Sequence, residues 1–223
     1  GYKCKYVGNP TADCIRELQM HNNNSEEYNS KSTTHNSKSI IAILPGSRRS
    51  EISHCLPIMW SAARQVAGNQ YRIVVTAAPG IEDAFYLPYL QGEELTRDTY
   101  TLLSQARAAV VNSGTATLET ALIGCPQTAV YHVTGSKYLE WLIKPILFKI
   151  KHFTLVNIIA GKEVIKELVG QKFTTSNIEK ELSILLNDEP YRAHMQSDYK
   201  AIQHILGDEP APMNAAQIIL SKL

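Results

Sequence analysis

The sequence has few cysteines, and none of them form a Cys-x-x-Cys pair; they are Cys4, Cys14, Cys55 and Cys125. Scattered single thiols fit a reducing cytoplasm better than a disulfide framework. The seven histidines show no His-x-x-x-His spacing and no matching cysteine cluster, so neither a metal site nor a cofactor is predicted. The sequence contains no continuous run of about 18 apolar residues, and its first residues do not resemble a signal peptide. We therefore expect a cytoplasmic location.

The chain also lacks an excess of charge of either sign, since 22 basic and 21 acidic residues leave a formal net charge of +1. This balance gives no reason to expect a nucleic-acid partner. No Gly-x-Gly-x-x-Gly is present, and Glu163 follows Gly161-Lys162 where a P-loop needs Ser or Thr. Without a Gly-x-Ser-x-Gly motif, Ser47 and Ser113 are poor candidates for nucleophiles.

Apolar runs alternate with helical patterns along residues 39–206. We expect strands at 40–44, 71–76, 108–111 and 128–131, and helices at 49–67, 81–89, 99–105, 115–123, 163–169, 176–186 and 189–206. This alternation predicts an α/β fold, a Rossmann-like parallel sheet with helices on both faces. Ligands of such sheets bind at the carboxyl ends of the strands.

The flanking segments have a different composition. Residues 1–18 are expected to contain a strand and a turn at Gly8-Asn9-Pro10. Residues 19–38 are dense in Asn, Ser, Thr and Lys, and such a segment buries too little apolar surface to offset its ordering entropy. We therefore expect a mobile polar loop there. Residues 207–223 are expected to form a C-terminal tail helix that starts after Asp208-Glu209-Pro210.

A turn of small residues, Ser113-Gly114-Thr115-Ala116-Thr117, joins an apolar run to a helical pattern. Free backbone N–H groups and the helix dipole favour an anion at such a helix start. Glu119, one turn further, could accept hydrogen bonds from a pair of sugar hydroxyls. The alternative is an ordinary capped helix after a strand, and this segment alone does not separate the two.

A second turn, Pro45-Gly46-Ser47-Arg48, likewise follows an apolar run and opens a helical pattern. The guanidinium of Arg48 is a planar fork suited to phosphate, and Glu51 could cap the helix or hold Arg48. Taken alone, Arg48 fits a solvated arginine at a helix start better than a phosphate ligand, and a solvated arginine is also our interpretation of Arg49. Both turns fall at the carboxyl ends of expected strands, and this coincidence favours the anion site.

Four motifs together resemble those of the lipid-A-disaccharide synthase family, in the same order and over nearly the whole chain. They are Leu44-Pro45-Gly46-Ser47-Arg48 with Glu51-Ile52, Ser113 to Glu119, Val7-Gly8-Asn9-Pro10 with Asp13, and Val156-Asn157-Ile158-Ile159-Ala160-Gly161-Lys162-Glu163 with Glu167-Leu168. The chain departs from the family pattern at Asn9 (for His), Val156 (for Pro), Lys162 (for Arg) and Gly170 (for Gln).

The resemblance implies a glycosyltransferase of the two-Rossmann-domain (GT-B) type. The family transfers 2,3-diacylglucosamine from UDP-2,3-diacylglucosamine to 2,3-diacylglucosamine 1-phosphate, which makes the lipid A disaccharide and releases UDP. By the same resemblance this chain is the C-terminal, donor-binding half, with residues 1–18 between the domains and residues 39–206 binding the UDP-sugar. The general base would lie in a missing N-terminal domain, so the chain alone is expected to be inactive.

The resemblance also assigns roles to single residues. Arg48 is our first candidate for a catalytic group, through contact with the diphosphate. Glu119 is expected to hold the ribose hydroxyls, and Asn157 the nucleotide or its sugar. Tyr131 either borders the uracil or belongs to the core. The remaining substrate-binding candidates surround the phosphates: Gly46, Ser47, Glu51, Ser113, Gly114, Thr115, Ala116 and Thr117.

Residues 136–151 mix aromatic and aliphatic side chains with four lysines. The mixture suits a membrane interface, which would be the inner membrane of a Gram-negative bacterium. A helix packed on the sheet, with lysines that extend to solvent, would have the same pattern. The tail helix could dock on the missing domain or be exchanged between two chains as a dimer contact. Two other functions remain open, namely another UDP-N-acetylglucosamine-type transferase or epimerase of this fold, and a non-catalytic nucleotide-binding module.

Overall fold

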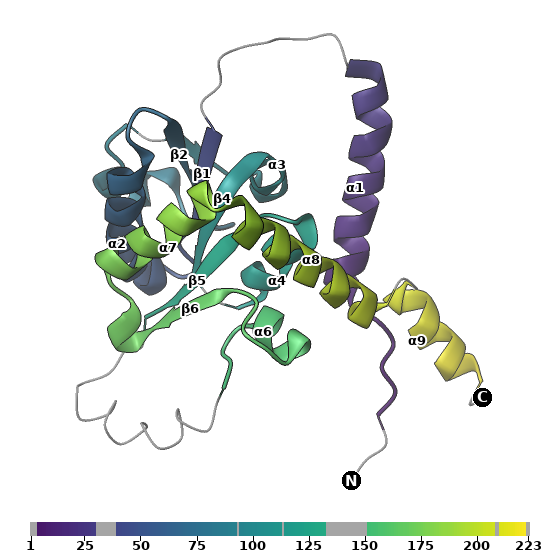
Figure 1. The fold of residues 1–223 in the computed structure, drawn as a ribbon. Coiled ribbons are helices and arrows are strands. Elements are labelled where there is room, and N and C mark those ends of the chain that lie inside the picture. The colour runs from purple at the N-terminus through teal and green to yellow at the C-terminus, as the bar shows by residue number, and fades with distance from the viewer. Residues whose placement is uncertain are drawn as a thin grey trace.

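The computed structural model describes residues 4–29, 39–92, 94–112, 114–132, 151–207 and 210–221 (Figure 1). Its centre is a six-stranded parallel sheet in the order β3-β2-β1-β4-β5-β6. The strands are β1 (Ser39–Leu44), β2 (Tyr71–Thr76), β3 (Glu94–Thr96), β4 (Ala106–Asn112), β5 (Gln127–Tyr131) and β6 (Lys166–Val169). The expected α/β architecture is confirmed.

Helices cover both faces of the sheet because β1 to β3 are added toward one edge of the sheet and β4 to β6 toward the opposite edge. From β1 the chain moves to β2 through α2 (Arg49–Ala67), and from β4 it moves the other way to β5 through α4 (Thr115–Ile123). Right-handed crossovers therefore put α2 and α4 on opposite faces. The helix α7 (Thr175–Asn187) packs beside α2, and α3 (Thr99–Gln105) lies on the other face. The switch point is between β1 and β4, where a ligand crevice is expected in such folds.

The strands at this switch point are buried on both sides. Ile41 and Ile43 of β1 point into the core beneath α2 and α7, whereas Ile40 and Ala42 pack against Leu102 of α3 on the other face. Parallel strands covered on both faces need such continuous apolar runs, which explains why β1 and β4 could be recognised from the sequence. The sheet is a rigid base for the turns that follow these two strands.

The strand expected before Gly8 does not form in residues 4–9, and a helix, α1 (Pro10–Asn29), follows in place of part of the loop expected in residues 19–38. The side-chain oxygen of Asn9 accepts hydrogen bonds from the backbone N–H groups of Thr11 (2.9 Å) and Ala12 (3.4 Å) and so caps the helix, with Pro10 at its first position. Ile15 is 3% exposed and anchors the first turns, which lie beside α4. The loop prediction is therefore wrong for residues 19–29, while residues 30–38 lie outside the described residues.

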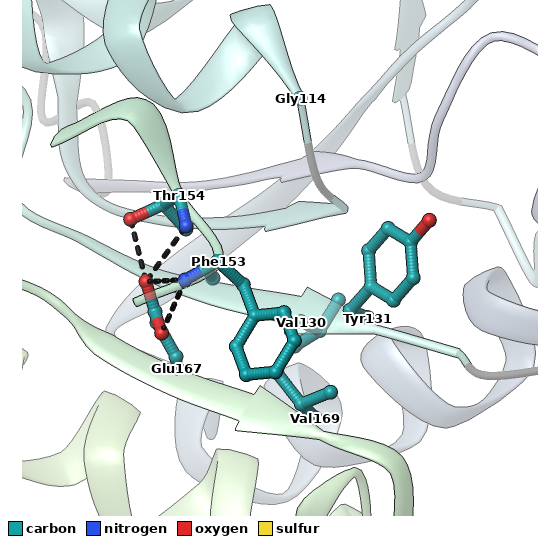
Figure 2. A pocket seen from close by; sticks show the side chains of 8 residues that line it. Gly114, Val130, Tyr131, Phe153, Thr154, Glu167 and Val169 are labelled. Carbon is teal, nitrogen blue, oxygen red and sulfur yellow. Dashed lines mark hydrogen bonds between the residues drawn. The ribbon is translucent and has the colours of Figure 1, made fainter. Parts of the chain in front are cut away.

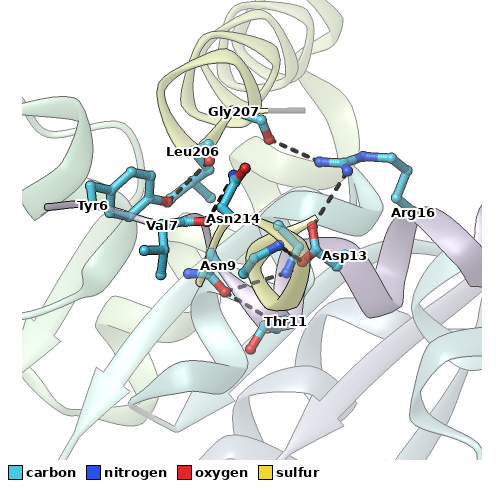
Figure 3. Close-up of polar contacts among 11 residues, drawn as sticks. Tyr6, Val7, Asn9, Thr11, Asp13, Arg16, Leu206, Gly207 and Asn214 are labelled. Atoms are coloured by element: carbon cyan, nitrogen blue, oxygen red, sulfur yellow. Dashed lines mark hydrogen bonds and ion pairs between the residues drawn. The ribbon is translucent and has the colours of Figure 1, made fainter. Parts of the chain in front are cut away.

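The C-terminal part of the chain folds back onto the start of α1 (Figure 3). The connection between α8 (Glu189–Leu206) and α9 (Ala211–Leu220) is held by Asp13, whose carboxylate accepts from the N–H of Ala211 at 2.7 Å. Arg16 donates to the carbonyl of Gly207 at 2.9 Å. Two more bonds join these segments, from Tyr6 Oη to Leu206 O and from Asn214 Nδ2 to Val7 O. Residues 6–16 and the tail thus form one unit.

The other differences from the sequence prediction are local. The helix expected at 163–169 is instead β6, whose residues pair with β5 from Thr128↔Lys166 to Tyr131↔Val169. The helix expected at 81–89 is two short 3-10 turns, η1 (Asp83–Phe85) and η2 (Leu87–Tyr89), and the second contains Pro88 in its first turn. Besides α1, three elements of the described residues were not predicted: β3, the 3-10 turn η3 (Gly170–Lys172) and α6 (Leu155–Ala160). Within the described ranges, no helix is long and apolar enough to cross a membrane.

Candidate functional site

The two predicted anion-binding turns lie next to each other at the carboxyl edge of the sheet. β1 and β4 are neighbours, with Leu44 paired to Val111, so the residues that follow each strand meet. Asn112, the last residue of β4, donates from Nδ2 to the carbonyl of Pro45 at 2.9 Å and joins the two turns. The prediction that both turns open at the same edge is confirmed by this contact.

In the first turn, the Glu51 carboxylate organises the backbone. Its Oε2 accepts from the N–H groups of Ser47 (3.1 Å) and Arg48 (3.3 Å), which caps the first turn of α2. Gly46 has a φ of 111°, and a Cβ atom at this position would lie 2.7 Å from both Asn112 Nδ2 and Glu51 Oε2. Only glycine fits between these side chains. Gly46 and Glu51 thus shape the turn, and the backbone N–H groups of Ser47 and Arg48 already have an internal acceptor.

The two arginines of the first turn differ in their partners. The Arg48 side chain is 78% exposed, and its Nη1 lies 2.9 Å from Glu51 Oε1. Arg49, which we expected to be solvated, pairs with Glu82, and its guanidinium lies 4.8 Å from the centre of the Phe85 ring. Exposed ion pairs are weak, so the Arg48 guanidinium can exchange Glu51 for a ligand phosphate at little cost.

In the second turn, Gly114 is the N-cap of α4, with a φ of 64°. Thr115 is exposed, and Ala116 is half-buried against the core. Thr117 is fully buried, and its hydroxyl donates to the Gly114 carbonyl at 2.9 Å, so this side chain braces the turn and its hydroxyl proton is not offered to a ligand. Ser113 lies outside the described residues.

Glu119 is half-buried on α4 and lies near Tyr100 of α3. Burial raises the pKa of its carboxyl group above the usual value. Its charge also contributes, after burial, to the raised pKa of the Tyr100 hydroxyl on α3. None of the hydrogen bonds found among the described residues involves this carboxylate. A half-buried carboxylate with its acceptor positions open is suited to a pair of ligand hydroxyls.

A pocket of about 440 Å³ opens beside Gly114, at the ends of β5 and β6 (Figure 2). Tyr131, the last residue of β5, lines it and is 45% exposed, so it is not a core residue. The lining comes from three segments of the chain besides Gly114: Ala129 to Tyr131, Phe153 with Thr154, and Glu167 with Val169.

Asn157 does not lie at the surface of this pocket, in contrast to the ligand contact that the sequence suggested. It is fully buried, and its Nδ2 donates to Ile165 O (2.9 Å) and to Glu167 Oε1 (3.0 Å). Its Oδ1 accepts from the N–H groups of Val164 (2.7 Å) and Ile165 (3.0 Å). All four hydrogen-bonding positions of the amide are therefore occupied within the protein, which makes Asn157 a structural residue.

Three polar residues of the site, and the apolar residues that line the pocket with Tyr131, were not among the predicted ones. Asn112 stood at the edge of the second motif, but its bond to Pro45 depends on the pairing of β1 with β4. Thr154 is the N-cap of α6, and its hydroxyl also donates to Glu167 at 2.7 Å. In the sequence, only its place in the Glu-Leu pair that matches the family motif could have pointed to Glu167. Among the described residues, no three His, Cys, Asp or Glu side chains gather as metal ligands would.

Comparison with solved structures identifies the fold. The chain is similar to the S. aureus MnaA–UDP co-structure, with a TM-score of 0.56 and 15% identity over 92% of this chain and 50% of that one. It is also similar to the spinosyn forosaminyltransferase SpnP, with a TM-score of 0.53 and 14% identity over 83% of this chain and 43% of that one. At such low identity the likeness is one of fold, namely one half of the GT-B architecture.

Comparison of sequences is more specific. The family model described as lipid-A-disaccharide synthetase matches residues 1–219. The lipid-A-disaccharide synthase of Koribacter versatilis is 37% identical over 81% of this chain and 49% of its own length, and that of Trichlorobacter lovleyi is 32% identical over 99% and 58%. The chain thus spans about half the length of these relatives, and it belongs to the lipid-A-disaccharide synthetase family.

Proposed function

We propose that this chain is the donor-binding half of a glycosyltransferase that moves 2,3-diacylglucosamine from UDP to 2,3-diacylglucosamine 1-phosphate. The observation that carries the proposal is the pair of turns joined by the Asn112–Pro45 bond at the switch point of the sheet. An exposed arginine, Arg48, follows β1, and the N-terminus of α4, with the half-buried Glu119 one turn further, follows the neighbouring strand β4. A nucleoside diphosphate offers the matching groups, two phosphates and a ribose diol.

The roles of the residues follow from their geometry. Arg48 would leave Glu51 to bind the diphosphate, whose charge grows as the bond to the sugar breaks, and a cation placed there lowers the barrier. The N–H groups at the start of α4, from Gly114 onward, would bind the same phosphates. Glu119 would accept from the ribose hydroxyls. Ser47, Glu51 and Thr117 support the turns.

We infer that the general base belongs to the part of the relatives' length that this chain does not span. Among the described residues, burial raises the pKa of two acidic side chains, Glu119 and Glu181. We assign Glu119 to the ribose, and Glu181 accepts a hydrogen bond from Tyr191 at 2.7 Å on the α7 side of the sheet. The isolated chain is therefore expected to bind UDP and to transfer no sugar. Turnover by this chain alone would contradict the assignment.

The first test is a thermal shift titration of the chain with UDP, NAD and ATP. UDP is expected to raise the Tm by mass action, and NAD and ATP are not. Arg48→Ala should weaken UDP binding about 10- to 100-fold, because a hydrogen bond to a charged group contributes about 1.5–3 kcal/mol. Arg49→Ala is the matched control, since Arg49 is held by Glu82 and Phe85.

Each outcome of this titration separates the alternatives. Stabilisation by ATP or NAD in place of UDP would favour a different nucleotide-binding module. Equal losses in the Arg48 and Arg49 variants would remove Arg48 from the phosphate site. A 2-epimerase or another UDP-N-acetylglucosamine enzyme of this fold would also bind UDP, and against these the match to the family model over residues 1–219 favours the lipid A reaction.

A second prediction concerns the carboxylate of Glu119. Because burial raises its pKa in the folded state, the folded protein holds this proton to higher pH than the unfolded chain, and ionisation costs stability as pH rises above the usual 4.5. Glu119→Gln is therefore expected to raise the Tm at pH 7. The gain should disappear at pH 4, where both states are largely protonated.

The same variant should bind UDP more weakly, because the amide offers one acceptor oxygen where the carboxylate offers two. Thermal melts at pH 4 and pH 7 with and without UDP measure both effects. A Glu119→Gln protein that is less stable at pH 7 would show that the carboxylate has an internal role.

We propose further that the whole enzyme works at the cytoplasmic surface of the inner membrane of a Gram-negative bacterium, with both substrates anchored there by their acyl chains. The mixture of lysine and aromatic residues at 136–151 suits such a surface, although all of this stretch except Lys151 lies outside the described residues. On α9 the side chains of Met213, Ile219 and Leu220 are exposed, and they would offer an apolar face to the part of the relatives' length that this chain does not span, or to a second chain.

A further inference from the structure

Two of the polar side chains that line the pocket beside Gly114, Glu167 and Thr154, are occupied by each other and by neighbouring groups. The Glu167 carboxylate accepts from the N–H groups of Phe153 (3.0 Å) and Thr154 (2.8 Å), from the Thr154 hydroxyl (2.7 Å) and from Asn157 Nδ2 (3.0 Å). The Thr154 oxygen also accepts from the N–H of Asn157 at 3.3 Å. Figure 2 shows Glu167 turned toward Thr154 and the backbone of Phe153.

With these two side chains satisfied, the other side chains of the wall are hydrocarbon except for the Tyr131 hydroxyl. Val130 and Val169 form one side, and the rings of Phe153 and Tyr131 stand beside them (Figure 2). Phe153 is 39% exposed and Tyr131 is 45% exposed, so both rings face solvent in the free chain. A sugar or a base placed here would lose hydrogen bonds to water and find few new partners, which disfavours polar ligands. A hydrocarbon chain has no such loss and would remove these rings from water.

The position of the pocket indicates where this hydrocarbon would come from. Gly114 is both part of its lining and the N-cap of α4 in the anion-binding turn. Glu119 lies near Tyr100 of α3, which packs over β1 and β4, whereas the pocket lies at β5 and β6. In a UDP-sugar with its ribose at Glu119 and its diphosphate at Gly114, the sugar beyond the diphosphate therefore extends toward the pocket.

We propose that this pocket binds an acyl chain of the donor lipid-sugar while the diphosphate of the same molecule lies at the Gly114 turn. The proposal rests on the proposed function, because it uses UDP binding to place the chain. Phe153 and Val169 are then specificity residues for an acylated donor. They favour it over UDP-N-acetylglucosamine, which has only an acetyl group.

The test compares dissociation constants measured by calorimetry on this chain. The ligands are UDP, UDP-N-acetylglucosamine and a UDP-2,3-diacylglucosamine with hexanoyl chains, which stays monomeric in water. One methylene group in a well-formed apolar pocket lowers the dissociation constant about tenfold. The acylated donor should therefore bind at least about tenfold more tightly than UDP-N-acetylglucosamine. Phe153→Ser should remove most of this gain and change the dissociation constant of UDP less than about twofold.

Two variants serve as controls. Phe153→Leu keeps a hydrocarbon side chain and should retain most of the gain. Ile184→Ser removes an apolar side chain of similar exposure, 42%, from α7 on the other face of the sheet and should retain all of it. Circular dichroism melts of each variant confirm that the fold is intact.

The outcomes distinguish this inference from the proposed function. Failure to bind UDP contradicts the proposed function, and a dihexanoylglucosamine without UDP then tests the pocket directly. UDP binding without any acyl gain, or a gain that Phe153→Ser leaves unchanged, overturns the acyl pocket alone. Binding to phosphatidylcholine vesicles that Phe153→Ser abolishes, without an acyl gain on the soluble donor, would assign the two rings to a membrane surface and also overturn the proposal.

Discussion

Replacement of Asn157 by alanine is expected to lower the free energy of unfolding by about 3–5 kcal/mol, the upper range for a single substitution. The amide is fully buried and makes four hydrogen bonds, two to the backbone of Ile165, one to Val164 and one to Glu167. Its removal leaves two N–H groups and a carbonyl buried without partners. Each such group costs about 1–3 kcal/mol, and the costs are not fully additive because the bonds form one network.

Urea unfolding monitored by circular dichroism measures this loss. Asn187→Ala is the matched control, because Asn187 is exposed at the end of α7 and makes one bond, from Nδ2 to Ser183 O at 2.8 Å. It should change the free energy of unfolding by less than about 1 kcal/mol. If the two variants lost similar stability, the network around Asn157 would not be what holds α6 to β6.

The same variant separates a structural role from a ligand contact. Asn157 holds Glu167, and Glu167 in turn holds the N–H groups of Phe153 and Thr154 that start α6. At a temperature where Asn157→Ala is still folded, UDP affinity should therefore change little, whereas the pocket beside Gly114 should loosen. The sequence motif marks this residue as important without telling which of the two roles it has.

The elements that the sequence predicted well are those whose signals are local. The bounds of α2 (Arg49–Ala67) and α8 (Glu189–Leu206) coincide with the expected helices, because each combines an apolar periodicity with clear end signals. β1 and β4 are continuous apolar runs. By contrast, β6 is the short segment Lys166–Val169, which starts with two charged residues and is a strand only because β5 offers it an edge.

The same division applies to the candidate site. Both turns could be recognised because glycine, small residues and hydroxyls follow apolar runs, and Glu119 stands one turn into the helix. The pocket beside Gly114 could not be foreseen, since it depends on long-range contacts between Glu167 and the 153–157 segment. The polar character of residues 19–29 likewise concealed α1, whose first turns are fixed by the Asn9 cap and by the packing of Ile15.

Gly46→Ala is expected to cost about 2–4 kcal/mol of stability and to weaken UDP binding by at least about tenfold. Two effects add at this position. The φ of 111° is one that residues with a Cβ rarely adopt, and the new methyl group would lie 2.7 Å from Asn112 Nδ2 and from Glu51 Oε2. Relief of that overlap requires both side chains to move, and these are the groups that join the two turns and cap α2.

Gly80→Ala separates the two effects. Gly80 also has a positive φ, 78°, but a Cβ there meets nothing within 4 Å. Its substitution should therefore cost only the backbone strain, about 1–2 kcal/mol, and leave UDP affinity unchanged. Urea unfolding and UDP calorimetry on the two variants give the comparison. If Gly46→Ala behaved like Gly80→Ala in both measurements, the contact between the turns would not matter for the ligand. A selective loss of UDP binding in the Gly46 variant would show that the packing of the two turns against each other builds the phosphate site.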